Sequence, residues 1–150
     1  MAQGTDATIL AALLDHLEAL AFTPAMQIAM PGVSFTPPVY TDDGPEHRKG
    51  DPKPYLAASF LPNETTNSEI GEGQEQHRGL LQVSVFWKKG VGHIKPLEAA
   101  DRIITHFAKG TTLHRNGLKI IIDRKPFAAS PLQETDRVQV PVTVRYHAFA

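Results

Sequence analysis

Two segments show the alternation of apolar and polar positions that is typical of β-strands. In the segment His77–Lys88, one side of the strand would be wholly apolar and the other side mixed, because side chains alternate across a strand. This pattern predicts a central strand of a sheet that is covered on one face by helices. In the segment Arg137–Phe149, valines alternate with polar residues, as in a half-buried antiparallel strand. The positions on the predicted covered side of the first segment are Leu81, Val83, Val85 and Trp87.

Apolar residues recur at helical spacing in two other segments. The first predicted helix spans about residues 6–21, and Thr5 or Asp6 supplies a capping oxygen at its start. Its polar face has no lysine or arginine, which favours packing on a sheet over binding to a membrane surface. The second predicted helix spans about residues 95–108, with Pro96 at its first position. The two apolar stripes are Ile9, Leu10, Leu13, Leu14, Leu17 and Leu20, and Leu97, Ala100, Ile103, Ile104 and Phe107.

Shorter segments predict the remaining strands. Residues 26–30 alternate as a short strand, and residues 55–61 form a long-looped antiparallel hairpin with the central strand. Residues 118–123 predict another strand, and residues 111–114 pair with it across the Asn116-Gly117 turn.

The order of these elements predicts an α+β fold. Two helices would pack on one face of a mainly antiparallel sheet, within a single domain over residues 1–150. Long polar loops would span residues 41–54 and 63–76. The first loop has no apolar periodicity, so we expect it to be exposed and mobile.

Composition narrows the possible partners and compartments. The formal net charge of the 150 residues is -1, with 15 basic and 16 acidic side chains, which gives no electrostatic basis for binding nucleic acid or an anionic membrane. The chain has no cysteine, so disulfides and thiolate chemistry are excluded. The N-terminus lacks a basic segment before its apolar run, and no apolar run reaches the ~20 residues of a membrane-spanning helix. We therefore expect a protein made in the cytoplasm.

No stretch of the sequence predicts catalysis, a cofactor or a metal site. The seven histidines show neither HxH nor HExxH spacing. The acidic run Thr41–Glu46 lacks the ligand order of a calcium loop, and the short Gly-X-Gly segments lack the rest of a phosphate-binding fingerprint. No serine lies in a GxSxG motif. The chain is therefore predicted not to be an enzyme.

Several segments together resemble the tail-terminator-like proteins of long-tailed bacteriophages and prophages. They are VSFTPP (33–38), YLAASFLPNETT (55–66), HRGLLQVSVFW (77–87), LEAADRIITHFAKGT (97–111) and VQVPVTVRYHAF (138–149). The likeness covers most of the chain in order, and it rests on the combination of segments rather than on any one motif. The charged stretch TDDGPEHRKGDPKP (41–54) departs from it, because it is longer than the family usually carries.

The resemblance implies a structural role in the virion. Such proteins form a ring, commonly of six copies, that caps the tail tube, ends its polymerisation and offers a surface to the head-completion or connector protein. DNA would pass through the lumen without specific contact, assembly would take place in the host cytoplasm, and no cofactor would be needed. Two alternatives remain open: another head–tail connector or tail tube component, and a small α+β enzyme.

Candidate interface residues follow from the polar loop and from the last strand. We expect the loop 63–76 and Arg78 to meet a neighbouring subunit or the tube, although the same sequence fits a solvent-exposed loop without contacts equally well. Pro141 cannot donate a backbone hydrogen bond, so its strand should lie at a sheet edge or carry a bulge there, and such an edge would be open to an adjacent protomer. The candidate interface residues are Asn63, Glu64, Thr65, Thr66, Arg78, Pro141 and Arg145.

Overall fold

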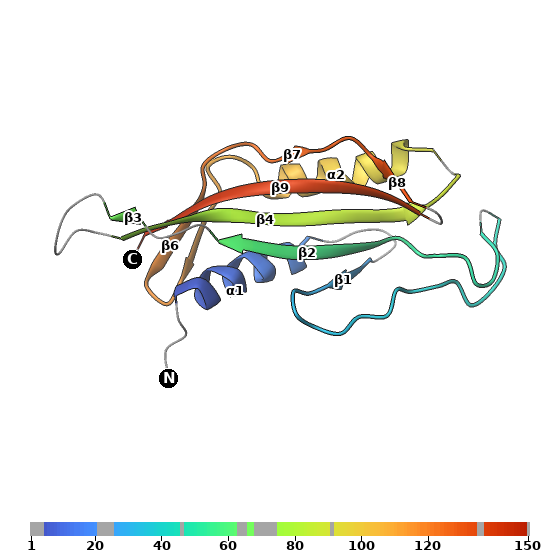
Figure 1. Cartoon of the computed structure of the whole chain (residues 1–150), viewed down its shortest axis with the longest axis horizontal. Coiled ribbons are helices and arrows are strands. Elements are labelled where there is room, and N and C mark those ends of the chain that lie inside the picture. The colour runs from blue at the N-terminus through green and yellow to red at the C-terminus, as the bar shows by residue number, and fades with distance from the viewer. Residues whose placement is uncertain are drawn as a thin grey trace.

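The fold is a mostly antiparallel sheet with two helices, α1 (Thr5–Glu18) and α2 (Ile94–His106) (Figure 1). The computed structural model describes residues 5–20, 26–45, 47–62, 66–67, 75–90, 92–134 and 137–149. Within them, the strands are β1 (Gln27–Ala29), β2 (Tyr55–Pro62), β3 (Thr66–Asn67), β4 (Glu75–Lys88), β5 (Thr112–Arg115), β6 (Leu118–Ile122), β7 (Phe127–Ala128), β8 (Leu132–Gln133) and β9 (Arg137–Phe149). The sheet order is β1-β2-β4-β9-β6-β5, with β3 paired to β4 and with β7 and β8 paired to β9. The predicted α+β fold is thus confirmed.

The longest ladder of the sheet joins β4 and β9. It is antiparallel and unbroken from the pair Gln76–Phe149 to the pair Lys88–Arg137. On the other side of β4, β2 pairs along its whole length, while β1 adds to β2 in parallel. The central strand and its long-looped hairpin with β2 are therefore confirmed.

One face of this layer carries the core. The register puts the apolar odd-numbered residues of β4 on the same side as the even-numbered residues of β9. Fully buried residues of both helices belong to the same cluster, so both helices cover this face, as predicted. Each such aliphatic side chain contributes roughly 1.5–3 kcal/mol on burial. The central members are Ile9, Leu13 and Leu17 of α1, Ala100 and Ile103 of α2, Leu81, Val83 and Val85 of β4, and Val140, Val142 and Val144 of β9.

We call this side of the layer the covered face. The opposite side, to which the even-numbered residues of β4 and the odd-numbered residues of β9 point, is called the open face.

The prediction that Pro141 marks a sheet edge or a bulge is wrong. Pro141 is buried in an interior strand, opposite Ser84 in the unbroken ladder with β4. Its carbonyl accepts a 2.8 Å hydrogen bond from the Ala129 N–H at the end of β7. The N–H and C=O of a strand residue point to the same side, so the missing donor of Pro141 faces the gap between β7 and β8 rather than β4. Pro141 therefore ends the pairing of β9 with β7 and leaves the pairing of β9 with β4 unbroken.

The turn before β6 forms as predicted. Asn116 and Gly117 have φ angles of 50° and 80°, and two successive residues with positive φ are typical of a type I′ hairpin turn. This turn joins β5 to β6 in an antiparallel pair. The sequence analysis did not predict β7 and β8, which together line the outer side of β9.

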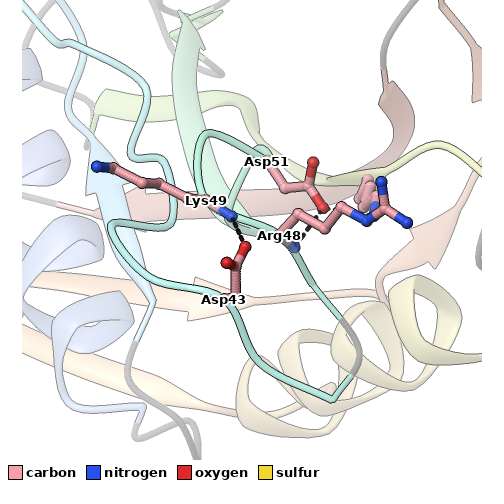
Figure 2. Close-up of polar contacts among 5 residues, drawn as sticks. Asp43, Arg48, Lys49 and Asp51 are labelled. Atoms are coloured by element: carbon pink, nitrogen blue, oxygen red, sulfur yellow. Dashed lines mark hydrogen bonds and ion pairs between the residues drawn. The ribbon is translucent and has the colours of Figure 1, made fainter.

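The exposed polar loop predicted over residues 41–54 is closed by backbone hydrogen bonds into a hairpin over residues 39–53. It projects from one end of the sheet (Figure 1). The Tyr40 N–H donates to the Asp51 carbonyl at 2.9 Å, and the Gly50 N–H donates to the Tyr40 carbonyl at 2.7 Å. Figure 2 shows two aspartates that bind backbone N–H groups, Asp43 with Lys49 and Asp51 with Arg48. These bonds give the charged segment a fixed shape.

One ion pair ties this hairpin to the sheet. The Lys88 ammonium at the end of β4 lies 2.7 Å from the Asp51 carboxylate. The hydrogen bond from Lys88, together with that from the Arg48 N–H, holds the pKa of Asp51 below its usual value.

Candidate assembly surface

The predicted interface residues separate into three groups. Asn63, Glu64 and Thr65 lie outside the described residues. Thr66 belongs to the short β3, where it pairs with Gln76. The other three residues, Arg78, Pro141 and Arg145, all point to the open face.

Two of these residues place positive charge on the open face. Arg78 lies opposite His147 and Arg145 lies opposite Leu80, so the two arginines are diagonal neighbours, about 7–8 Å apart between backbones. Both are exposed, and so is Lys119 of β6, which points to the same face. Asp123, which follows β6, lies 2.9 Å from the His147 ring. Among the described side chains, this end of the open face presents the exposed Arg78, Arg145 and Lys119.

The open face also carries three large apolar side chains that the sequence analysis did not single out. Leu61, Phe127 and Leu132 are 50%, 51% and 52% exposed. The register places them opposite Leu80, Thr143 and Gln139, respectively, so all three point to the open face. Phe127 and Leu132 lie in two-residue strands, where no periodicity signals the face to which a side chain points. The three side chains lie in different rows of the same face.

The opposite end of the open face is filled by its own side chains. The rings of Tyr55 and Phe86 stack at 4.7 Å between centroids. The Arg137 guanidinium lies 4.9 Å from the Phe86 centroid, donates to the Tyr55 hydroxyl at 2.6 Å and donates to the Glu134 carboxylate at 2.8 Å. Arg137 is thus engaged by side chains of its own chain, whereas Arg145 at the other end of the open face is exposed.

On the covered side, two histidines join the ends of the helices. The rings of His16 and His106 stack at 4.0 Å, and each Nε2–H donates to the backbone carbonyl of the other residue. These bonds satisfy two carbonyls at helix C-termini. Burial lowers the pKa of His16 from its usual value of 6.5; the His106 ring adds to this lowering, while the hydrogen bond to the His106 backbone opposes it. Burial in this contact therefore favours the neutral form of His16.

A pocket beside this histidine pair bears on the enzyme alternative. The pocket is lined by Leu20, Asp101, Arg102, Thr105 and His106. Asp101 and Thr105 are exposed, and the His106 ring is engaged with α1. Successive side chains on a helix point about 100° apart, so Thr105 and His106 do not form a nucleophile–base pair. In the described part of the chain, no three His, Cys, Asp or Glu residues are grouped so as to hold a metal ion. No described helix is long and apolar enough to cross a membrane.

The layer has helices on one face and exposed cations and apolar side chains on the other. Comparison with known proteins gives the class of protein. A family described as phage tail terminator protein matches residues 8–146, and the chain belongs to this family. It therefore has a structural role in a phage tail and contacts other tail or head components. The family is structural rather than enzymatic.

Solved structures support the fold. One solved structure matches with a TM-score of 0.74 at 24% sequence identity, over 97% of this chain and 96% of its own. No curated protein matches the sequence.

Proposed function

We propose that copies of this protein close into a ring, with six as the expected number, that caps the tail tube and ends its polymerisation. The observation that carries the proposal is the open face, where exposed leucine and phenylalanine side chains lie beside exposed cations although the core is complete on the other face. A soluble subunit gains from such a surface only if another chain covers it. Membership of the tail terminator family supports a tail tube as one partner.

The same ring would offer its second surface to the head-completion or connector protein, in the assembled virion and after assembly in the host cytoplasm. DNA would pass through the lumen. The nearly balanced charge of -1 suits a passage in which DNA slides, because tight binding requires many phosphate contacts. No step of this function requires a cofactor or a reaction.

The test combines solution mass with tube growth. Native mass spectrometry of the purified chain, alone and with short tail tubes, should give a single closed ring mass. Adding the protein to polymerising tube protein should stop elongation, seen by electron microscopy as tubes of limited length. Open-ended polymers of the chain itself would instead support a tube component, and tubes that lengthen unchanged would overturn the capping role.

A further inference from the structure

We propose that, in this ring, the open face of one copy packs against the outer side of α1 of the next copy. The inference rests on the proposed ring and specifies its subunit contact. It assigns two different surfaces of the chain to one interface, so the contact is head-to-tail. Contacts of this kind either close into rings or continue as filaments.

The outer side of α1 is unusually apolar for a surface helix. Its inner positions, such as Leu13, are fully buried in the core. Ala7 and Ala11, four residues apart, lie on the outer side, where Ala7 is exposed and Ala11 is partly exposed; Leu14 flanks them and packs in part against the core. Among the described side chains of α1, the exposed charges, Asp15 and Glu18, lie only in its last two turns.

The second helix provides an internal comparison. The outer positions of α2 are charged, with Lys95, Glu98, Asp101 and Arg102 all exposed. This is the ordinary pattern for a helix with one side in water. The two helices cover the same face of the same sheet, so the apolar outer side of α1 is not a general property of the layer.

Charge makes the two surfaces complementary. α1 has no lysine or arginine, and Glu18 lies exposed in its last turn. A carboxylate is unfavourable there, because a helix C-terminus carries partial negative charge. Asp15 of the same helix has a partner in Arg115, whereas among the described residues Glu18 has no ion pair. A cation supplied by the neighbouring copy would compensate both charges.

The open face supplies such a cation beside apolar side chains. In the part of the chain that the structure describes, the exposed Arg145 has no ion pair. Leu61 lies in the same cross-strand row, and Phe127 lies one row further along the sheet. The β4–β9 ladder is about 40 Å long at about 3.4 Å per residue, so it is long enough to accept a helix of 14 residues, about 21 Å. We therefore pair Glu18 of one copy with Arg145 of the next.

Because the chain has no cysteine, the contact is testable by disulfide formation. A variant with both Glu18→Cys and Arg145→Cys should form a ladder of cross-linked species under mild oxidation, up to the ring size. Chains with only one of the two substitutions should cross-link as dimers when mixed and should not cross-link alone. A matched control pairs Arg145→Cys with Lys109→Cys, an exposed residue just beyond α2, and should give no ladder.

Charge reversal gives a second readout. Arg145→Glu and Glu18→Arg should each weaken ring formation by about tenfold or more, measured by light scattering over a range of concentrations, and the double variant should recover it. Lys109→Glu makes the same charge change elsewhere and should leave assembly unaltered. The contact would be overturned if the wild-type chain formed a closed ring, the double cysteine variant gave no series of cross-linked species, and both charge-reversal variants still assembled normally. The ring proposal would survive that result. A chain that stays monomeric even with tail tubes would overturn the ring itself.

Discussion

Gly79 of β4 lies at the closest approach between three strands, which makes its replacement by alanine a sharp test of the packing. A Cβ atom at this position would lie 2.5 Å from the Tyr146 hydroxyl, 2.8 Å from the Leu61 carbonyl oxygen and 2.8 Å from Cα of Pro62. Its φ angle is not in the left-handed region, so an alanine fits the backbone conformation. The only obstacle is therefore space.

The expected magnitude is a balance of two effects. A Gly→Ala change in an allowed conformation normally stabilises a protein by about 0.4–1 kcal/mol through the unfolded state. Here two of the three contacts are with backbone atoms of β2, which cannot rotate away, and overpacking of this kind costs about 1–3 kcal/mol. The net loss should be about 1–2 kcal/mol. For a chain of this size, that lowers Tm by about 2–8 °C.

Thermal and urea unfolding, followed by far-UV circular dichroism, measure this loss directly. Ser59→Ala, at an exposed position on β2, serves as the control and should stay within about 0.5 kcal/mol of the wild type. Adding Tyr146→Phe to Gly79→Ala removes the closest contact, so the double variant should lose less than the sum of the two single losses. A Gly79→Ala protein as stable as the wild type would refute the close approach of β2, β4 and β9.

Two further variants test the core and the histidine pair. Leu81→Ala removes a fully buried side chain at the centre of the covered face and should lower the free energy of unfolding by about 2–5 kcal/mol in urea titrations; a loss below about 1 kcal/mol would contradict the assignment of that face. The pKa of His16 is lowered in the folded chain. As the pH falls, His16 is therefore protonated near pH 6.5 in the unfolded chain but only at lower pH in the folded chain. The free energy of unfolding should therefore fall as pH drops below about 6.5, and His16→Gln should show a smaller fall between about pH 7.5 and about pH 5.5 than the exposed control His114→Gln. Equal falls in the two variants would contradict the lowered pKa of His16.

Local periodicity predicted the parts of the fold in which one face is buried over many residues. β4 and β9 each alternate over a dozen positions, and this pattern was sufficient to identify the strands and the helix-covered face. The two helices were found for the same reason, at a period of 3.6. Element boundaries shifted by a few residues, as at α1, which ends at Glu18 rather than near residue 21.

Two kinds of feature could not be predicted from the sequence: the side to which a backbone group of a strand points, and contacts between residues far apart along the chain. Pro141 was assigned to an edge because a sequence does not indicate which neighbouring strand a given N–H faces. β7 and β8 are too short to show a period, so the exposed Phe127 and Leu132 were overlooked. The hairpin at 39–53 is held by backbone bonds and by aspartate contacts with N–H groups, none of which produces apolar alternation. Its attachment to β4 depends on Lys88, 37 residues from Asp51.

Alternate side chains of the same strands face the core and the open face. Along β9, Val142 and Val144 enter the core, while Thr143 and Arg145 between them reach the open face. A substitution at Val142 or Val144 therefore acts on the core, whereas one at the exposed Arg145 leaves the core unchanged and tests the proposed contact between copies. A shift of one residue in the register between β4 and β9 would turn every side chain of β9 to the opposite face of the sheet. The long unbroken ladder therefore also fixes which side chains of β9 face the core. It fixes Arg145 on the side away from the helices, as the proposed contact with a neighbouring copy requires.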